Sequence, residues 1–289
     1  MAFLGSPAIA VPALDALVEA DLEVVLVVSG VDKRRGRGRE TSPTPVKKRA
    51  IELGLPVSAE VDDLLLLDLD LAVVVAFGQL LRRPVLEHVA MVNIHFSDLP
   101  RWRGAAPVER AILAGDTSSA VCIIDVAEGL DEGDVFGCSE FPIAPTSTLG
   151  SLWEEMSHVG AELLVETIDA GLWQRQPQQG EVTYAHKLGV QDREIDWSQT
   201  AEEVLRVVRV GGAWTTFSGQ RFKIHEAAAA SVSLPVGEID GLLVGTGSGG
   251  VELIVVQPAG KPRLDASAWV HGAQPDGVKF ESSEKHSDG

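Results

Sequence analysis

Short apolar runs alternate with amphipathic stretches through the first half of the chain. Residues 24–28 and 71–77 are continuous apolar runs of the kind that form buried strands in a parallel sheet. Apolar side chains recur at helical spacing in residues 11–18, and a second helical stretch over residues 46–54 ends at Gly54. This alternation predicts βαβ units, and therefore an α/β fold with a mostly parallel sheet.

The same pattern continues along the chain and changes after about residue 173. Residues 91–95 and 121–126 are further predicted strands, and residues 106–114 are a predicted helix. After residue 173 the chain becomes rich in Gln, Pro and Gly, and beyond residue 213 short β-rich runs are separated by glycines, which indicates a small β-barrel. We expect four parts: a catalytic domain at 1–183, a linker at 184–199, a smaller barrel domain at 200–280 and a disordered tail at 281–289.

Composition excludes several classes of protein. With 289 residues, of which 45% are hydrophobic, the chain can bury a sizeable core without disulfides or a metal. Two cysteines, Cys122 and Cys138, make neither a disulfide framework nor a zinc site, so we expect them to be reduced thiols that fill the core. No apolar run approaches the roughly 20 residues of a membrane span, and no signal peptide is evident. We therefore expect a cytoplasmic protein with no metal and no membrane partner, and a monomer.

The formal net charge of −18 hides an uneven distribution. Residues 33–49 hold 8 basic residues against one acidic residue, whereas residues 196–289 hold 8 basic and 12 acidic residues. A run of charge is usually a solvated surface, but one positive loop in an acidic protein can also attract a polyanion to a single place. The candidate contacts of such a loop are Lys33, Arg34, Arg35, Arg37, Arg39 and Lys47.

Three polar residues follow predicted strands. Asn93 and His95 are two positions apart on one strand and so point to the same face. Asp131 lies in the Gly-flanked acidic segment 128–134, which follows the strand at 121–126. An amide, an imidazole and a carboxylate at neighbouring strand ends suit acyl transfer to an amine. Taken alone, however, His95 could be a structural histidine, and the acidic segment could be only a turn or a poor calcium loop.

A resemblance to a known family changes that balance. Asn93-x-His95, the following stretch Leu-Pro-Arg-Trp-Arg-Gly-Ala-Ala-Pro at 99–107 and Gly-Leu-Asp-x-Gly-Asp at 129–134 resemble the methionyl-tRNA formyltransferases. The resemblance runs in order from about residue 3 to about residue 226, through Ala-Phe-Gly-Gln at 76–79 and Gly-Ala-Trp-Thr-Thr-Phe at 212–217.

The resemblance implies a Rossmann-like formyltransferase domain followed by an OB-like barrel. It implies transfer of the formyl group of 10-formyltetrahydrofolate to the α-amine of methionyl initiator tRNA, with Asn93, His95 and Asp131 as the catalytic residues. It further implies tRNA binding by the basic loop. The residues implied to contact folate are Phe77, Gly78, Gln79, Leu80, Ser97, Asp98, Leu99 and Pro100.

Two other functions remain as alternatives. A nucleotide-sugar N-formyltransferase shares the Asn-x-His and Asp signals, although the stretch at 101–107 and the basic loop favour tRNA. A non-catalytic paralogue that binds tRNA or folate is disfavoured by the intact Asn93, His95 and Asp131. A dinucleotide-dependent dehydrogenase is disfavoured because no GxGxxG follows the first strand; the glycines at 245–250 are expected in a hairpin turn.

Overall fold

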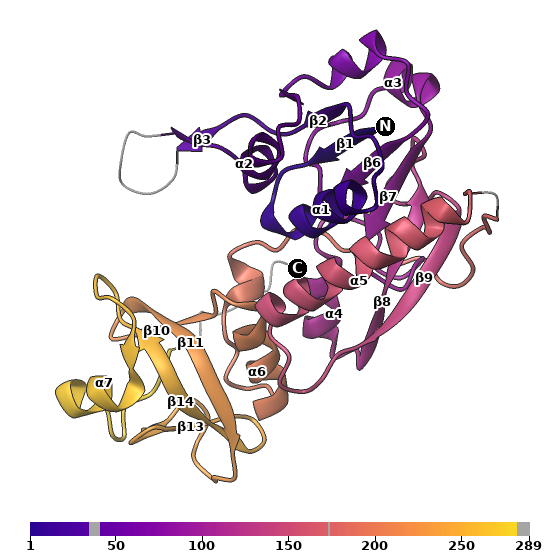
Figure 1. Ribbon diagram of the computed structural model, residues 1–289. Helices are drawn as coiled ribbons and strands as arrows, with labels where there is room; N and C mark the ends of the chain where they lie inside the picture. The colour runs from indigo at the N-terminus through magenta and orange to yellow at the C-terminus, as the bar shows by residue number, and fades with distance from the viewer. Residues whose placement is uncertain (35–40, 173, 282–289) are drawn as a thin grey trace. The chain divides into compact units, whose positions relative to one another are not determined.

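The chain folds into two compact units in a computed structural model that describes residues 1–34, 41–172 and 174–281 (Figure 1). The first unit comprises Met1–Val108, Ser118–Pro142 and Ser151–His186. The second comprises Glu109–Thr117, Ile143–Gly150 and the chain from Lys187 onward. Two segments that we expected in the first domain thus belong to the second unit, and the expected linker at 184–199 is divided between the units. Of the expected tail, residues 282–289 lie outside the described residues.

The first unit is built on a seven-stranded sheet with the order β5-β2-β1-β6-β7-β8-β9. The pairings from β5 to β7 are parallel, and those of β7 with β8 and of β8 with β9 are antiparallel. The predicted mostly parallel sheet is therefore confirmed, with an antiparallel edge. Its strands are β1 (Ala2–Gly5), β2 (Leu26–Val28), β5 (Val57–Ser58), β6 (Ala72–Val75), β7 (Met91–His95), β8 (Ser118–Asp125) and β9 (Val135–Pro142). A separate two-stranded ribbon pairs β3 (Lys33–Arg34) with β4 (Thr41–Ser42).

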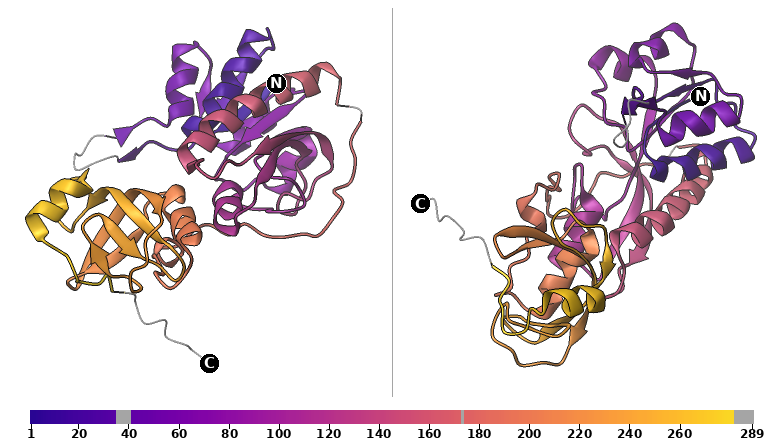
Figure 2. Two further views of the ribbon diagram at one scale, coloured as in Figure 1. Left: turned by 90° about the horizontal axis from the view of Figure 1, so that it is seen from below. Right: turned by 90° about the vertical axis from the view of Figure 1, so that its left-hand side faces the viewer.

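Helices cover both faces of this sheet (Figures 1 and 2). Successive side chains of the central strands β1 and β6, which point to opposite faces, are therefore all buried. Leu4, Val28 and Val74 share the face that packs against α3 and a 3₁₀ helix. In α5, Gly160 lies so close to the sheet that an added Cβ would stand 2.9 Å from the Ile94 side chain. The helical elements of this unit are α1 (Val11–Glu19), α2 (Pro45–Glu52), α3 (Arg83–His88), α5 (Leu149–Asp169), and 3₁₀ helices at Ala8–Ala10 and Val61–Leu66. Most of α4 (Pro107–Ala114) and a 3₁₀ helix at Gln191–Arg193 belong to the second unit.

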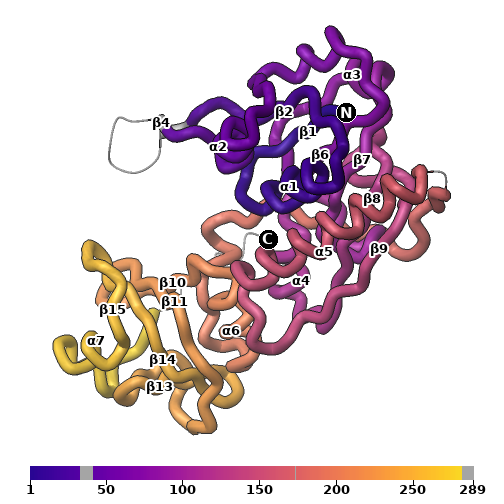
Figure 3. The backbone as a smooth tube through the Cα atoms, viewed as in Figure 1, coloured from indigo at the N-terminus to yellow at the C-terminus, as the bar shows by residue number. Residues whose placement is uncertain are grey.

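The second unit is a β-barrel. Its strands run in the order β10-β11-β14-β13-β12, and β15 pairs with β14. The segment at Lys279–Glu281 bridges the two ends of this order, since Glu281 pairs with Thr216 of β10 and Lys279 pairs with Glu238 beside β12. The predicted barrel is thus present. Its elements, traced in Figure 3, are α6 (Ala201–Val210), β10 (Trp214–Phe217), β11 (Gln220–Ala230), β12 (Ile239–Asp240), β13 (Leu243–Gly245), β14 (Gly250–Gln257), β15 (Leu264–Asp265) and α7 (Ala266–Ala273).

Aromatic side chains fill the barrel core. Trp197, which we expected in the linker, is 1% exposed there, stacks on Phe280 and donates a hydrogen bond from Nε1 to the Thr215 hydroxyl. Thr200 is the N-cap of α6 and forms a capping box with Glu203. The glycines at 245–250 form the predicted hairpin between β13 and β14.

The two cysteines differ from expectation. Cys122 of β8 and Cys138 of β9 lie directly opposite each other in the antiparallel ladder and form a disulfide. The expectation of two reduced, core-filling thiols is therefore wrong for this structure: Cys122 is fully buried, whereas Cys138 is exposed. Composition could not reveal the pair, because only the register of β8 on β9 brings the two positions together. In the part of the chain that the structure describes, no helix is long and apolar enough to cross a membrane.

Candidate active site

The candidate catalytic residues meet at the carboxyl end of β7. Asn93 and His95 project from one face of this strand, where the parallel part of the sheet meets its antiparallel edge. Asp131 reaches them from the segment between β8 and β9. All three line one cavity of about 630 Å³, a size typical of small-molecule sites. The structure thus brings together the amide, imidazole and carboxylate that the sequence suggested.

His95 is held between two oxygen atoms. Its Nε2 lies 3.1 Å from the main-chain carbonyl oxygen of Trp102, and its Nδ1 lies 3.5 Å from Oδ2 of Asp131. Because a carbonyl oxygen only accepts hydrogen bonds, Nε2 carries a proton in this arrangement. Nδ1 is then the nitrogen that gains or loses a proton, and the Asp131 carboxylate faces it.

Burial sets the protonation of His95. The side chain is 6% exposed, and desolvation lowers the pKa of His95 below its ordinary value of 6.5. The Asp131 charge and the Trp102 carbonyl oppose this effect, whereas the positive charge of Arg103 adds to it. The lowered pKa keeps His95 neutral at neutral pH, with Nδ1 free to accept a proton.

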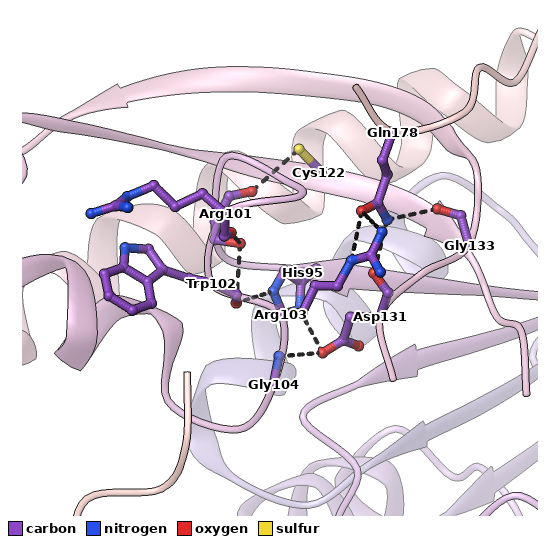
Figure 4. A network of polar contacts seen from close by, with 10 residues as sticks. His95, Arg101, Trp102, Arg103, Gly104, Cys122, Asp131, Gly133 and Gln178 are labelled. Atoms are coloured by element: carbon purple, nitrogen blue, oxygen red, sulfur yellow. Dashed lines mark hydrogen bonds and ion pairs between the residues drawn. The ribbon is translucent and has the colours of Figure 1, made fainter. Parts of the chain in front are cut away.

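Asp131 adopts an uncommon backbone conformation. Its φ of 51° lies in the left-handed region, which residues other than glycine seldom adopt. Its Oδ2 accepts a hydrogen bond of 2.8 Å from the N–H of Gly104. The Gln178 carboxamide donates to the main-chain oxygens of Asp131 and Gly133, both at 2.8 Å (Figure 4). The position of the carboxylate is thus fixed by contacts from two distant segments.

The Asn93 side chain differs from those of His95 and Asp131. No side-chain hydrogen bond joins it to the residues that the structure describes, although it lines the cavity. Both ring nitrogens of His95 already face protein oxygens, so the Asn93 amide is the donor most readily available to a bound ligand.

The residues expected to contact folate fall into two groups. Phe77, Gly78, Gln79 and Leu80 line the cavity beside His95, and Leu80 is 81% exposed. They follow Ala76, whose φ of 46° turns the chain sharply after β6.

The second group differs from the first. Ser97, Asp98, Leu99 and Pro100 are not among the residues that line the cavity. Ser97 donates to the carbonyl oxygen of Arg101 at 2.7 Å, and the Leu99–Pro100 peptide bond is cis. This loop presents the Trp102 carbonyl to His95, so in this structure it supports the site rather than lining it.

The basic residues are only partly described. The backbones of Lys33 and Arg34 form β3, which pairs with β4, and Arg35, Arg37 and Arg39 lie outside the described residues. Lys47 at the start of α2 forms a 2.8 Å ion pair with Asp32.

Three further residues of the site were missed by sequence reasoning. Arg103 donates to Oε1 of Gln178 from Nε at 3.0 Å and from Nη2 at 2.7 Å, and Gly104 supplies the N–H that binds Asp131. Arg103 and Gly104 lie inside the stretch that carried the family resemblance, which was a usable signal. Gln178 lies in a stretch rich in Gln and Pro, whose pattern indicated only a connector.

An α/β sheet whose strand ends bring Asn, His and Asp to one cavity defines a group-transfer enzyme of the acyl-transfer kind. Residues 1–168 match the family model described as formyl transferase, and residues 187–274 match the formyl transferase C-terminal domain. The chain belongs to the formyl transferase family.

The similar proteins refine this placement. A methionyl-tRNA formyltransferase of Paenarthrobacter aurescens (strain TC1) is 45% identical, over 96% of this chain and 99% of its own. One of Arthrobacter sp. (strain FB24) is 43% identical with the same coverage. A Helicobacter canadensis N-formyltransferase, solved with folinic acid and dTDP-3-aminofucose, shares the fold with a TM-score of 0.68 at 16% identity, over 89% of this chain and 98% of its own.

Proposed function

We propose that the protein transfers the formyl group of 10-formyltetrahydrofolate to the α-amine of methionyl initiator tRNA, in the cytoplasm, for translation initiation. One observation carries the proposal. A chain 43–45% identical over 96% of its length to methionyl-tRNA formyltransferases places Asn93, His95 and Asp131 around a single cavity.

The cavity suits a folate donor. Its lining includes residues 76–81, which are mainly apolar, and the polar residues Asn93, His95 and Asp131. A flat ring system can pack on the apolar residues while its formyl group is bound by the polar ones. Among the described residues no group of three or more His, Cys, Asp or Glu side chains could hold a metal ion, and the reaction as proposed uses none.

Each of the three residues has a distinct role in the proposed reaction. The neutral amine attacks the formyl carbon, and the Asn93 amide donates a hydrogen bond to the developing oxyanion. His95 Nδ1 accepts the proton that the amine loses, and Asp131 stabilises the resulting imidazolium. His95 then returns that proton to N10 of the folate as the C–N bond to the donor breaks. In the structure Nε2 is engaged by Trp102, so donation from His95 to the oxyanion requires that Nε2 exchange this carbonyl for substrate.

We further propose that tRNA binds through Lys33, Arg34, Arg35, Arg37, Arg39 and Lys47, and that the protein acts as a monomer. The charge distribution supports tRNA binding at this loop, because residues 33–49 carry 8 basic residues and one acidic residue within a chain of net charge −18.

A comparison of two acceptors in separate reactions tests the function. The purified protein is incubated with 10-formyltetrahydrofolate and with either methionyl initiator tRNA or a dTDP-amino sugar, the class of acceptor found in the structurally similar N-formyltransferase. We expect formylmethionyl-tRNA and no formylated sugar. Formylation of the sugar alone would replace the proposal with the nucleotide-sugar function, and folate binding without transfer to either acceptor would favour a non-catalytic role.

A further inference from the structure

The Gln178 side chain uses every hydrogen-bonding position that a carboxamide has. Its Nε2 donates to the carbonyl oxygens of Asp131 and Gly133, each at 2.8 Å. Its Oε1 accepts from Nε and Nη2 of Arg103 at 3.0 Å and 2.7 Å. A carboxamide has two N–H donors and two acceptor lone pairs, so all four are occupied. Figure 4 shows Gln178 between Arg103 and the segment that carries Asp131.

The main chain on both sides of Gln178 is also fixed. Gln176 and Val135 exchange two main-chain hydrogen bonds, of 2.8 and 2.9 Å. Further along, the N–H of Arg103 donates to the Thr183 carbonyl at 2.9 Å, and the N–H of Ala185 donates to the Arg103 carbonyl at 2.7 Å. Gln178 therefore reaches the site from a segment that is attached to the sheet edge on one side and to residues 102–104 on the other.

The segment that Gln178 contacts needs such support. Asp131 has the left-handed φ of 51°, a conformation that costs a non-glycine residue about 1–2 kcal/mol. Two residues later, Gly133 packs so tightly against the Asp125 carbonyl oxygen that a Cβ would overlap it. The two donors of Gln178 hold the carbonyl oxygens on either side of this bend, and so fix the direction in which the Asp131 carboxylate leaves the chain.

Arg103 is held in a particular electrostatic state. A guanidinium is always charged, and its partner Oε1 is a neutral acceptor, so no nearby negative charge from this contact offsets the positive charge beside the site. That charge lowers the pKa of His95, against the raising effect of Asp131. A carboxylate in place of the carboxamide would still bind the guanidinium but would offset this charge.

We propose that Gln178 is a positioning residue for formyl transfer: it aligns Asp131 with His95 and holds the charged Arg103 guanidinium beside them. This inference rests on the proposed function, because it assigns Gln178 to the same reaction. Gln178 itself touches neither reacting atom; it acts through Asp131 and Arg103.

Two substitutions separate the contact of Gln178 with the Asp131 segment from its contact with Arg103. Gln178→Leu removes all four hydrogen bonds, and Gln178→Glu removes both donors but keeps two acceptors for Arg103. We expect kcat to fall about 10- to 100-fold in both variants, since a small misplacement of a reacting group has effects of this size. KM for Met-tRNA and for the folate is expected to change by less than about threefold, because neither substrate contacts Gln178 in the proposed reaction. Gln179→Leu is the matched control. Gln179 follows Gln178 in the sequence, and its side chain is exposed and makes no hydrogen bond to the described residues.

The pH profile distinguishes positioning from general support of the fold. In Gln178→Glu the added carboxylate offsets the Arg103 charge, so the acid limb of the kcat profile should shift to higher pH than in the wild type. A purely structural role would lower activity by one factor at every pH. The charged groups that face His95 are Asp131 and Arg103, and only the second is altered electrostatically by this substitution.

A titration of the His95 ring nitrogens by NMR, with ¹⁵N-labelled histidine, gives the same answer without turnover. We expect a higher pKa for His95 in Gln178→Glu than in the wild type. Failure of the wild type to formylate Met-tRNA would defeat the proposed function, whereas the NMR titration would still test Gln178. The proposal is overturned if both variants keep kcat within twofold, if the titration is unchanged in Gln178→Glu, or if both variants unfold, which would make Gln178 a residue of stability.

Discussion

The Nδ1 atom of His95 faces Oδ2 of Asp131 at 3.5 Å, and the same carboxylate oxygen accepts the N–H of Gly104 at 2.8 Å. The main-chain donor fixes the carboxylate independently of the imidazole. Asp131 therefore stays in place whether His95 is neutral or protonated, and it favours the protonated form that arises while the amine is attacking. This relationship makes the charge of Asp131, rather than its bulk, the property to test.

Asp131→Asn keeps the size of the side chain and an oxygen for Gly104 but removes the charge. We expect kcat for formylation of Met-tRNA to fall by about 10²–10⁴-fold, the range for losing the group that stabilises a catalytic imidazolium. Affinity for tRNA, measured by filter binding, should stay within about twofold. A fall in kcat of less than tenfold would contradict the role given to Asp131.

The burial of His95 should also appear in the pH dependence of stability. The pKa of His95 is lower in the folded protein than in the unfolded chain, so as the pH falls the unfolded chain takes up a proton before the folded protein does. The protein therefore loses stability as the pH falls from about 6.5 toward the folded pKa. Above 6.5 both states are neutral, and the full contribution is present.

Urea unfolding of the wild type and of His95→Gln between pH 7.5 and 5.5 checks this expectation. Within the window below 6.5, the wild type should lose up to about 1.4 kcal/mol per pH unit more than the variant. Groups common to both proteins, such as the half-buried Glu109, cancel in the comparison. Parallel curves for the two proteins would show that the His95 pKa is not lowered by folding.

Much of the fold follows from apolar patterning alone. The runs at 71–77 and 91–95 became β6 and β7, and the helical spacing at 11–18 became α1, because buried strands and amphipathic helices leave strong periodic signals. Patterning did not predict the antiparallel direction of β8, because buried strands carry the same apolar residues in either direction. It also gave no indication of α5, the longest helix described.

The site was predictable to the extent that its residues lie next to strands. Asn93 and His95 share a strand face, so a spacing of two residues placed them together. Gln178 could not be found this way, because its role depends on contacts with Arg103 and Asp131, which are distant in sequence. The loop at 97–100 is a different case: its four residues are not among those that line the cavity, so their contact with folate stays a prediction.

Two glycines in the acidic segment allow a matched test of its geometry. Gly133→Ala places a Cβ against the main-chain oxygen of Asp125 at the end of β8, whereas Gly129→Ala meets only the exposed side chain of Glu132. We expect Gly133→Ala to lower kcat at least tenfold and to lower Tm, since the bend at Asp131 must shift. Gly129→Ala should retain activity within about twofold. Equal effects of both substitutions would show that the bend does not depend on this close approach.

The basic loop gives the last prediction. Replacing Arg37 and Arg39 by Ala should weaken binding of Met-tRNA and should lower the slope of log K against log salt by about 2, because each lost phosphate contact releases about one counterion fewer. Lys261 and Arg263, exposed in the net acidic second unit, provide a control in which two positive charges are likewise removed. Their double replacement should leave the slope unchanged, because contact with the polyanion is expected where positive charge is concentrated. Equal changes in slope for the two double variants would contradict binding through a single loop.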